Sequence, residues 1–153
     1  MSATLGAIGI TPFAILFLIV GGMLIHPISL VVTRILGFPK ISEANRLPIL
    51  NTWLALSIPL GLPLVFMATL GGRTNLFFPA FSVLIGVHWL PFTYMYAMKS
   101  FAVLAGLFVL IGIVFGFVIT ESFSICGFVA GGVLLTSAVV NYLLVRRELK
   151  IGK

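Results

Sequence analysis

The residues of this chain that could do chemistry are few, and they lie inside long apolar stretches. His88 lies about midway along one of them, three residues before Pro91. Proline has no amide hydrogen, so the carbonyl of Val87 loses its helical donor beside the histidine. A polar ring at that depth needs a partner or water, and we expect His88 to face the bundle interior or a cavity. Because histidine titrates near neutral pH, the pattern is compatible with a proton-responsive group.

Other polar and aromatic residues would join His88 in a pocket. His26, followed by Pro27, lies toward the end of the first apolar stretch, Asn51 lies at roughly the same level in the second, and Asn141 lies near the end of the last. Trp89 is deep for an aromatic belt residue, so it lines a groove or contacts another helix, unless it simply faces lipid. The predicted cavity has His88 as its deepest member, and its candidate residues are His88, Pro91, Trp89, His26 and Asn51.

A structural interpretation competes with this one. Each histidine could bond a backbone carbonyl or a hydroxyl such as Ser57 or Thr93, and would then only fix the register of its helix. Pro59 and Pro63 similarly predict a bend in the second stretch. Transporters use such bends to expose carbonyls to a substrate, but bent helices are also ordinary packing devices.

Catalysis is the function class that the sequence supports least. The chain has no Asp, and its three acids, Glu43, Glu121 and Glu148, lie outside the apolar stretches. It contains no paired carboxylates, no HExxH motif, no phosphate-binding glycine loop and no Ser/His/Asp set. Cys126 is the single cysteine, which excludes an internal disulfide and a cysteine-based metal site. We therefore expect no enzyme, no metal and no cofactor, and the lack of buried carboxylates argues against a proton-driven pump.

The composition indicates an integral membrane protein. Hydrophobic residues make up 61% of the 153 residues, charged residues only 8%, and the mean hydropathy is +1.28. Such a chain cannot build the charged surface of a soluble domain. The net charge of +6 lies in short connections beside apolar spans, where it would bind anionic lipid headgroups rather than nucleic acid.

The apolar residues form five blocks, each long enough to cross a bilayer as a helix. The predicted fold is an all-α, polytopic transmembrane bundle that forms one domain over residues 1–153. Its connections are short, so consecutive helices should be antiparallel neighbours. The blocks cover approximately residues 5–32, 47–70, 76–98, 100–120 and 122–145, and a basic tail follows at 146–153.

The basic residues predict the orientation of these spans. Eight Lys and Arg residues lie on one side, whereas Arg73 alone lies on the other. The positive-inside rule places the richer side in the cytoplasm, which puts the amino terminus outside and the carboxyl terminus inside. The eight are Arg34, Lys40, Arg46, Lys99, Arg146, Arg147, Lys150 and Lys153.

Glycine pairs predict close helix packing in the last two blocks. Gly112 and Gly116 are four residues apart, as are Gly127 and Gly131, and both pairs lie at matching depths from the turn at Glu121. Facing glycines let helix backbones approach closely in lipid. We expect the two helices to form a tight glycine-packed hairpin, and a homo-oligomer interface is the competing use of the same residues.

Two segments carry a resemblance to a known family. Gly21 to Gly37, GGMLIHPISLVVTRILG, and Gly86 to Phe101, GVHWLPFTYMYAMKSF, resemble a family of small, uncharacterised bacterial multi-pass membrane proteins with a GxH, aromatic, Leu, Pro motif. Gly86, His88, Trp89, Leu90 and Pro91 match that motif. The resemblance implies a bacterial inner-membrane location, and that a further span can precede the first block, but no activity.

Two functions therefore remain open. The first is permeation or small-ligand binding through a polar, cytoplasm-facing cavity around His88. The second is a non-enzymatic accessory or scaffold subunit, whose glycine faces bind a second copy or another membrane protein. Membrane lipids are the expected surroundings in both cases.

Overall fold

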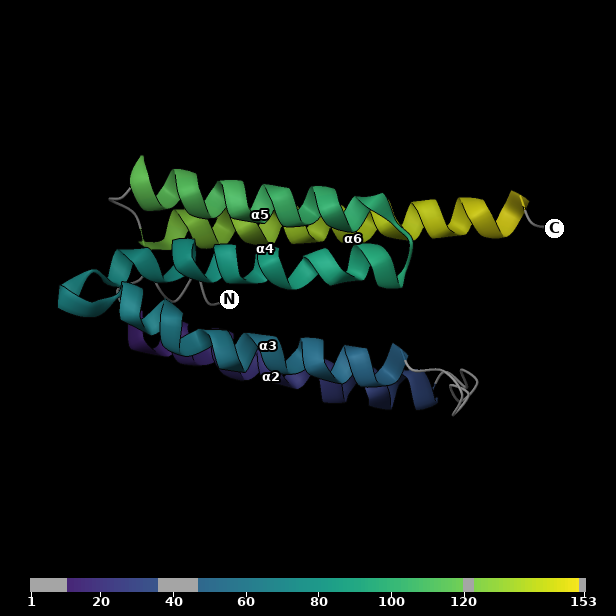
Figure 1. Cartoon of the computed structure of the whole chain (residues 1–153), viewed down its shortest axis with the longest axis horizontal. Helices are drawn as coiled ribbons and strands as arrows, with labels where there is room; N and C mark the ends of the chain where they lie inside the picture. Colours follow the sequence, from purple (N-terminus) through teal and green to yellow (C-terminus); the bar gives the residue numbers. More distant parts are fainter. Residues whose placement is uncertain (1–10, 36–46, 120–122, 152–153) are drawn as a thin grey trace. The chain divides into compact units, whose positions relative to one another are not determined.

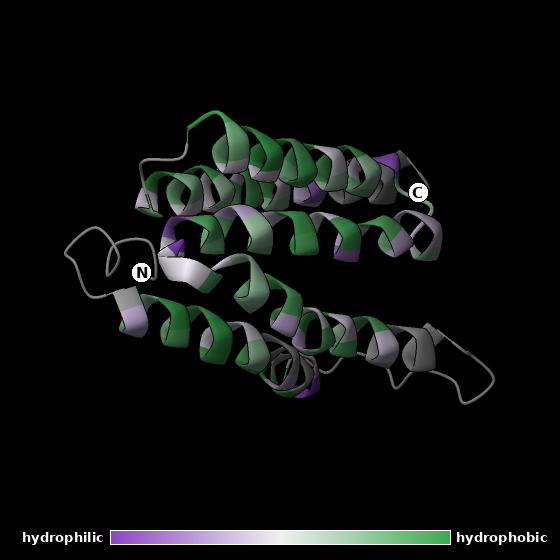
Figure 2. Ribbon diagram, turned by 60° about the vertical axis from the view of Figure 1, so that its left-hand side comes forward, coloured by the Kyte–Doolittle hydropathy of each residue, from purple (hydrophilic) through white to green (hydrophobic). Residues whose placement is uncertain are grey.

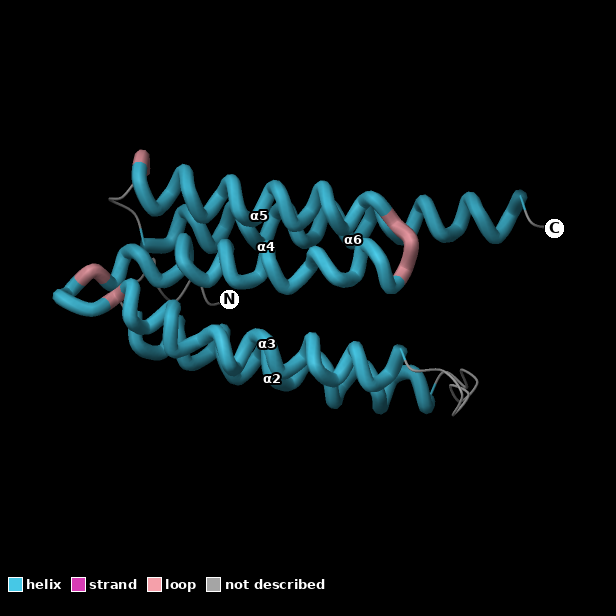
Figure 3. Tube along the Cα trace, viewed as in Figure 1, coloured by secondary structure: helices cyan, strands magenta, loops and turns pink. Residues whose placement is uncertain are grey.

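The described part of the chain is entirely helical. The computed structural model describes residues 11–35, 47–119 and 123–151, which form long helices joined by short turns (Figures 1 and 3). No strand occurs among these residues, and the predicted all-α class is confirmed. The helices are α2 (Thr11–Ile35), α3 (Leu47–Ala68), α4 (Phe77–Met95), α5 (Lys99–Phe117) and α6 (Phe123–Ile151), with two 3-10 turns, η1 (Leu70–Gly72) and η2 (Thr74–Leu76), between α3 and α4.

Three helical segments are long and apolar enough to cross a membrane: Thr74–Met95, Lys99–Phe117 and Phe123–Leu143. Shorter apolar helical segments cover Pro12–Leu24 and Trp53–Ala68. The colouring in Figure 2 shows hydrophobic residues along most of each helix. Large apolar side chains are also exposed on the helix surfaces, where a soluble protein would carry charge. These features are those of a membrane protein.

The chain divides into two compact units, residues 1–60 and 61–153. The first contains α2 and most of α3, with the side chain of Ala14 buried. The second contains the end of α3 and all of α4, α5 and α6, together with most of the buried side chains that the structure describes.

Within the second unit, α4 and α5 pack most closely, and glycine makes this possible. A Cβ atom at Gly86 of α4 would lie 2.8 Å from the carbonyl oxygen of Ala105 and 3.0 Å from the amide nitrogen of Val109. A Cβ atom at Gly112 of α5 would lie 2.7 Å from the carbonyl oxygen of Pro79. Each helix therefore presents one glycine to the backbone of the other, which is the close approach that small residues permit in lipid.

The prediction that Gly112 faces the glycines of α6 is wrong. Gly112 packs against Pro79 and Val83 of α4 rather than against α6, and a Cβ atom at Gly116 would meet Pro79 at 3.6 Å. A Cβ atom at Gly131 would have no heavy atom of the described residues within 4 Å, outside its own helix. The prediction failed because it matched glycines only by depth around the turn at 120–122, which lies outside the described residues. It overlooked Gly86, which pairs α5 with α4.

Side chains rather than glycines join α6 to α4. The Phe78 and Phe123 rings meet edge to face with centroids 4.8 Å apart. Further along, the Ser82 hydroxyl lies 3.7 Å from the sulfur of Cys126, and both side chains are buried. Phe77, fully buried, stacks on Phe81 with centroids 5.9 Å apart. The Phe78–Phe123 and Ser82–Cys126 contacts hold the start of α6 beside α4.

The turns that flank α4 use left-handed backbone conformations. Gly71 and Gly72 have φ values of 74° and 84°, which glycine adopts without a steric cost. Ala97, between α4 and α5, has a φ of 51°, which is uncommon for a residue with a side chain. This short turn brings the end of α4 directly to the start of α5.

Candidate functional site

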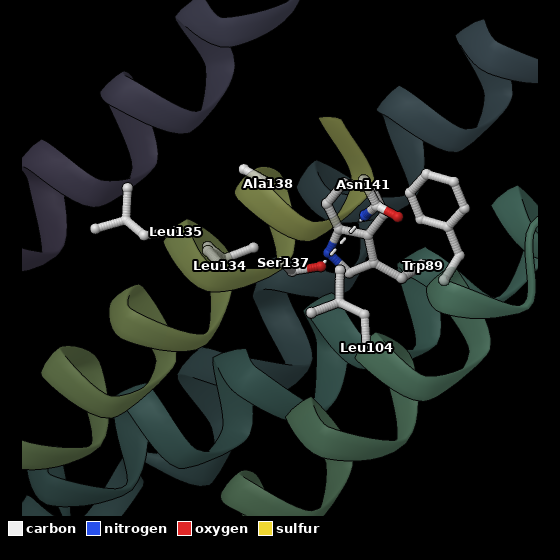
Figure 4. Close-up of a pocket in the computed structure, with 8 residues that line it drawn as sticks. Trp89, Leu104, Leu134, Leu135, Ser137, Ala138 and Asn141 are labelled. Atoms are coloured by element: carbon white, nitrogen blue, oxygen red, sulfur yellow. Dashed lines mark hydrogen bonds between the residues drawn. The ribbon is translucent and has the colours of Figure 1, made fainter. Parts of the chain in front are cut away.

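A partly open groove lies between α4, α5 and α6 in the second unit. Its volume is about 310 Å³. In Figure 4, Trp89 enters it from α4, Leu104 from α5 and Asn141 from α6. The lining residues are Trp89, Phe101, Leu104, Leu134, Leu135, Ser137, Ala138 and Asn141.

Trp89 forms one wall of the groove. Its indole stacks on the ring of Phe101 with centroids 5.6 Å apart and an interplanar angle of 10°. The short turn before Lys99 makes this pairing possible, because it places the first turn of α5 beside the last turns of α4. The indole Nε1 is buried and has no hydrogen-bond partner among the described residues. It is therefore an unused donor.

Asn141 supplies the complementary group. Its amide nitrogen lies 3.4 Å from Ser137 Oγ, one helical turn earlier on α6. This bond orients the amide and leaves Oδ1 as the free end. Asn141 Oδ1 is also buried without a hydrogen-bond partner in the described part of the chain. The groove thus contains one unused donor and one unused acceptor that do not bond each other.

Two more buried hydroxyls lie near this end of the helices. Thr93 Oγ1, one turn after Trp89, and Ser100 Oγ, one residue before Phe101, are both buried with no partner among the residues described. Unpaired polar atoms are rare in protein interiors. Each one is costly in free energy within the hydrocarbon layer, where no water can replace the missing partner. Their concentration at one end of the second unit indicates a polar layer there.

The groove has no acid-base or nucleophilic chemistry of its own. None of the described side chains that line it is ionisable, and the surface that they expose is almost entirely hydrocarbon and aromatic ring, because Trp89 Nε1 and Asn141 Oδ1 are buried. It can hold a molecule by hydrogen bonds and apolar contact. No group of three potential metal-ligating side chains occurs within residues 11–35, 47–119 and 123–151 as far as the structure describes them.

The structure places His88 beside the groove rather than in it. His88 meets the rings of Trp89 and Phe92 edge to face, with centroids 5.9 Å and 5.4 Å away. It is partly exposed, and neither it nor Pro91 is among the lining residues. Thr93 Oγ1 has no hydrogen-bond partner in the described regions, so of the partners suggested for the histidines it does not bond His88.

The other two cavity candidates are described only as backbone. His26 belongs to α2 and Asn51 to α3, and their side chains lie outside the described part of the structure. Ser57, the alternative histidine partner, donates its hydroxyl to the carbonyl of Leu54 at 2.7 Å. All the described residues that line the groove belong to the second unit.

A comparison with known protein families identifies a family for the chain but no activity. Residues 5–145 match a family of unknown function. The chain belongs to this family, DUF7010. The predicted resemblance to a family without an established function is thereby confirmed. No curated protein and no solved structure matches the chain. What the DUF7010 chain does must therefore be inferred from its own residues.

Sequence reasoning identified Trp89 and noticed Asn141, but not their meeting in one groove. It missed Ser137 and Phe101 entirely. The signal for Ser137 is its spacing of four residues from Asn141, which lets the hydroxyl and the amide interact on one helix face. The signal for Phe101 is weaker, because fourteen phenylalanines occur in the chain.

Proposed function

We propose that this DUF7010 protein is an inner-membrane protein of five spans that binds a small molecule in the groove around Trp89. The amino terminus lies outside and the carboxyl terminus lies in the cytoplasm. Three long apolar helical segments, two shorter ones and the eight-to-one distribution of basic residues support this arrangement. The site is centred on Trp89 and Asn141 instead of on His88.

The observation that carries the proposal is the unused donor and acceptor in one apolar groove. Trp89 Nε1 and Asn141 Oδ1 are both buried, and neither has a partner among the described residues. A buried polar group without a hydrogen bond costs about 1–3 kcal/mol. A ligand that satisfies both groups would recover this cost, and pockets with few polar groups on an apolar lining are typical of ligand sites.

The position of the groove suggests its side of the membrane. Trp89 lies six residues before Met95, about 9 Å from the end of α4 at a rise of 1.5 Å per residue. Lys99 follows at the start of α5, on the basic side of the predicted topology. The groove therefore belongs to the cytoplasmic half of the bilayer, where a ligand enters from the inner leaflet or the cytoplasm.

Native mass spectrometry of protein extracted gently from its own membranes tests the proposal. Ala138→Phe places a large ring in the groove, whereas Ala102→Phe places the same ring on an exposed position of α5 outside it. We expect one small-molecule mass on the wild type and on Ala102→Phe, and its loss from Ala138→Phe. Identical bound masses in the two variants would show that the groove is not the binding site.

A second function, the accessory subunit, is favoured by α6. Cβ atoms at Gly131 and Gly132 would meet no described heavy atom within 4 Å beyond their own helix, so the backbone of α6 is open to a close partner there. In this case the same spectra would contain a protein partner or a second copy in fixed proportion.

A substitution at Gly131 tests the accessory function. Gly131→Leu should break such a complex while leaving the monomer folded, because the added side chain points into open space. Gly112→Leu is a poor test, since Gly112 lies against the backbone of α4 and its replacement would damage the fold. A complex that survives Gly131→Leu and Gly132→Leu excludes this face as the interface.

A further inference from the structure

The groove also indicates what kind of molecule it holds. We infer that its ligand is a neutral hydrocarbon bearing a hydroxyl group, taken from the membrane. This inference rests on the proposed function, and it adds the chemical class of the ligand. Three properties of the groove carry it: the types of the two free polar atoms, the absence of charge, and the apolar remainder of the lining.

The two free atoms need a group that accepts one hydrogen bond and donates another. The Trp89 indole N–H is a donor only, so its partner must be an acceptor. Asn141 Oδ1 is an acceptor, because the amide nitrogen is engaged with Ser137 Oγ at 3.4 Å, so its partner must be a donor. One hydroxyl oxygen does both.

The absence of charge excludes ionic headgroups. Among the residues that the structure describes, no Lys, Arg, His, Asp or Glu lines the groove. A phosphate, carboxylate or ammonium placed there would lose its hydration without gaining a counter-charge, which is strongly unfavourable in a low-dielectric site. Common anionic phospholipids therefore do not fit by their headgroups.

The rest of the lining fits a hydrocarbon chain. The stacked rings of Trp89 and Phe101 form a flat wall, and Leu104, Leu134 and Ala138 complete the apolar surface. A volume of about 310 Å³ is at the small end of ligand pockets, which suits a hydroxyl with the first part of its chain. Leu135 lines the groove yet is 73% exposed, so the chain can continue past it into lipid.

Quenching of Trp89 fluorescence tests this chemistry directly. The chain has two tryptophans, and Trp53 is 65% exposed, so Trp53→Phe leaves Trp89 as the single reporter in a folded protein. The protein is placed in phosphatidylcholine nanodiscs and titrated with 3-bromoundecan-1-ol, with its methyl ether, and with 3-bromoundecane, so that the bromine of the bound alcohol lies near the indole. Bromine quenches on contact, the ether has lost the donor, and the bromoalkane has lost both donor and acceptor.

We expect saturable quenching by the alcohol, with a half-saturation concentration at least about fivefold lower than that of the ether, because the ether leaves Asn141 Oδ1 unpaired. Asn141→Leu should abolish this difference. Thr136→Val is the control, since Thr136 bonds the Gly132 carbonyl at 2.9 Å outside the groove, and it should preserve the difference. If Asn141→Leu does not fold, Ser137→Ala replaces it, because the variant frees the amide to turn and should narrow the difference.

The outcomes of this titration test two claims separately: that the groove binds a molecule, and that this molecule carries a hydroxyl group. Equal, saturable quenching by all three compounds would overturn the hydroxyl assignment and keep the groove as a binding site. Quenching that rises without saturation for every compound would overturn both. A large shift of Trp89 emission in Asn141→Leu without added ligand, together with no saturable quenching, would show that the indole and the amide pair with each other instead. An endogenous hydroxylated lipid is distinguished from a single-chain alcohol by whether extracted native lipid competes with the quencher.

Discussion

Trp89 combines two functions at the scale of a single residue. Its ring face packs on Phe101 and so joins α4 to α5, while its N–H points to no partner among the described residues. A side chain used only for packing would not need this donor, and phenylalanine would serve. We therefore expect Trp89→Phe to leave the free energy of unfolding within about 1 kcal/mol of the wild type, because the loss of part of the ring's packing is offset by removal of a buried, unpaired N–H. The same variant should lose the retained ligand, as measured by native mass spectrometry.

Loss of folding in Trp89→Phe would contradict this separation of roles. Trp53→Phe is its matched control, because Trp53 is exposed and does not line the groove. It should retain both stability and ligand.

Gly86 gives a second prediction at the residue scale. A Cβ atom there would meet the Ala105 carbonyl oxygen at 2.8 Å, and a backbone atom cannot move aside as a flexible side chain can. Gly86→Ala should therefore lower the free energy of unfolding by about 1–3 kcal/mol, the usual cost of overpacking. Thermal unfolding in detergent, followed by circular dichroism, measures the change.

Gly106 provides the control for Gly86. It lies on α5 and is exposed, and a Cβ atom added there would meet no atom of the residues described within 4 Å, outside its own helix. Gly106→Ala should be neutral or stabilising by up to about 1 kcal/mol, because alanine favours the helix. If both variants melt alike, the close approach of α4 and α5 is not as the structure describes it.

At the scale of the elements, the turn between α4 and α5 positions the groove. Ala97 has a φ of 51°, and a left-handed conformation costs a residue with a Cβ about 1–2 kcal/mol. Glycine avoids this cost but loses more chain entropy on folding. We expect Ala97→Gly to raise the free energy of unfolding by about 0.5–1 kcal/mol, whereas Ala102→Gly, on an exposed position within α5, should lower it by about 1 kcal/mol. If both variants change the free energy of unfolding equally in a denaturant titration, Ala97 does not hold a strained conformation.

The elements were largely predictable from the sequence, but their partners were not. Long apolar blocks specify helices directly, and α3 begins at Leu47, the first residue of the second predicted block. Pairing depends on which face each helix presents, and hydropathy is nearly uniform around such helices. The glycine spacing therefore suggested Gly112 as a packing residue but misidentified its partner, which is Pro79 and Val83 of α4.

The candidate site was predictable only in part for a related reason. Trp89 stood out because it is too deep for an interfacial belt, and it does line the groove. His88 attracted attention as an ionisable group, yet the described side chains that line the groove are all neutral. Sequence spacing identifies polar residues but does not give the rotation of each helix, and this rotation decides that Trp89 and not its neighbour enters the groove.

At the scale of the whole molecule, the orientation predicts which surfaces face each side of the membrane. Arg73 and Lys99 flank α4, and both are exposed. In a Cys126→Ala background, a membrane-impermeant thiol reagent added to intact cells should label Arg73→Cys but not Lys99→Cys. After the cells are permeabilised, it should label both. Labelling of both variants, or of Lys99→Cys alone, in intact cells would contradict the proposed topology.

The proposed function requires that the groove around Trp89 binds a small molecule in the membrane of living cells. Photo-crosslinking tests it most directly, with p-benzoylphenylalanine introduced in place of Leu134, which lines the groove, or of Val139, which is exposed on α6 but does not. After irradiation of cells, we expect a small-molecule adduct of one defined mass at Leu134 that is absent at Val139. The same mixture of phospholipid adducts at both positions, or a protein adduct at Leu134, would show that the groove does not bind one defined small molecule.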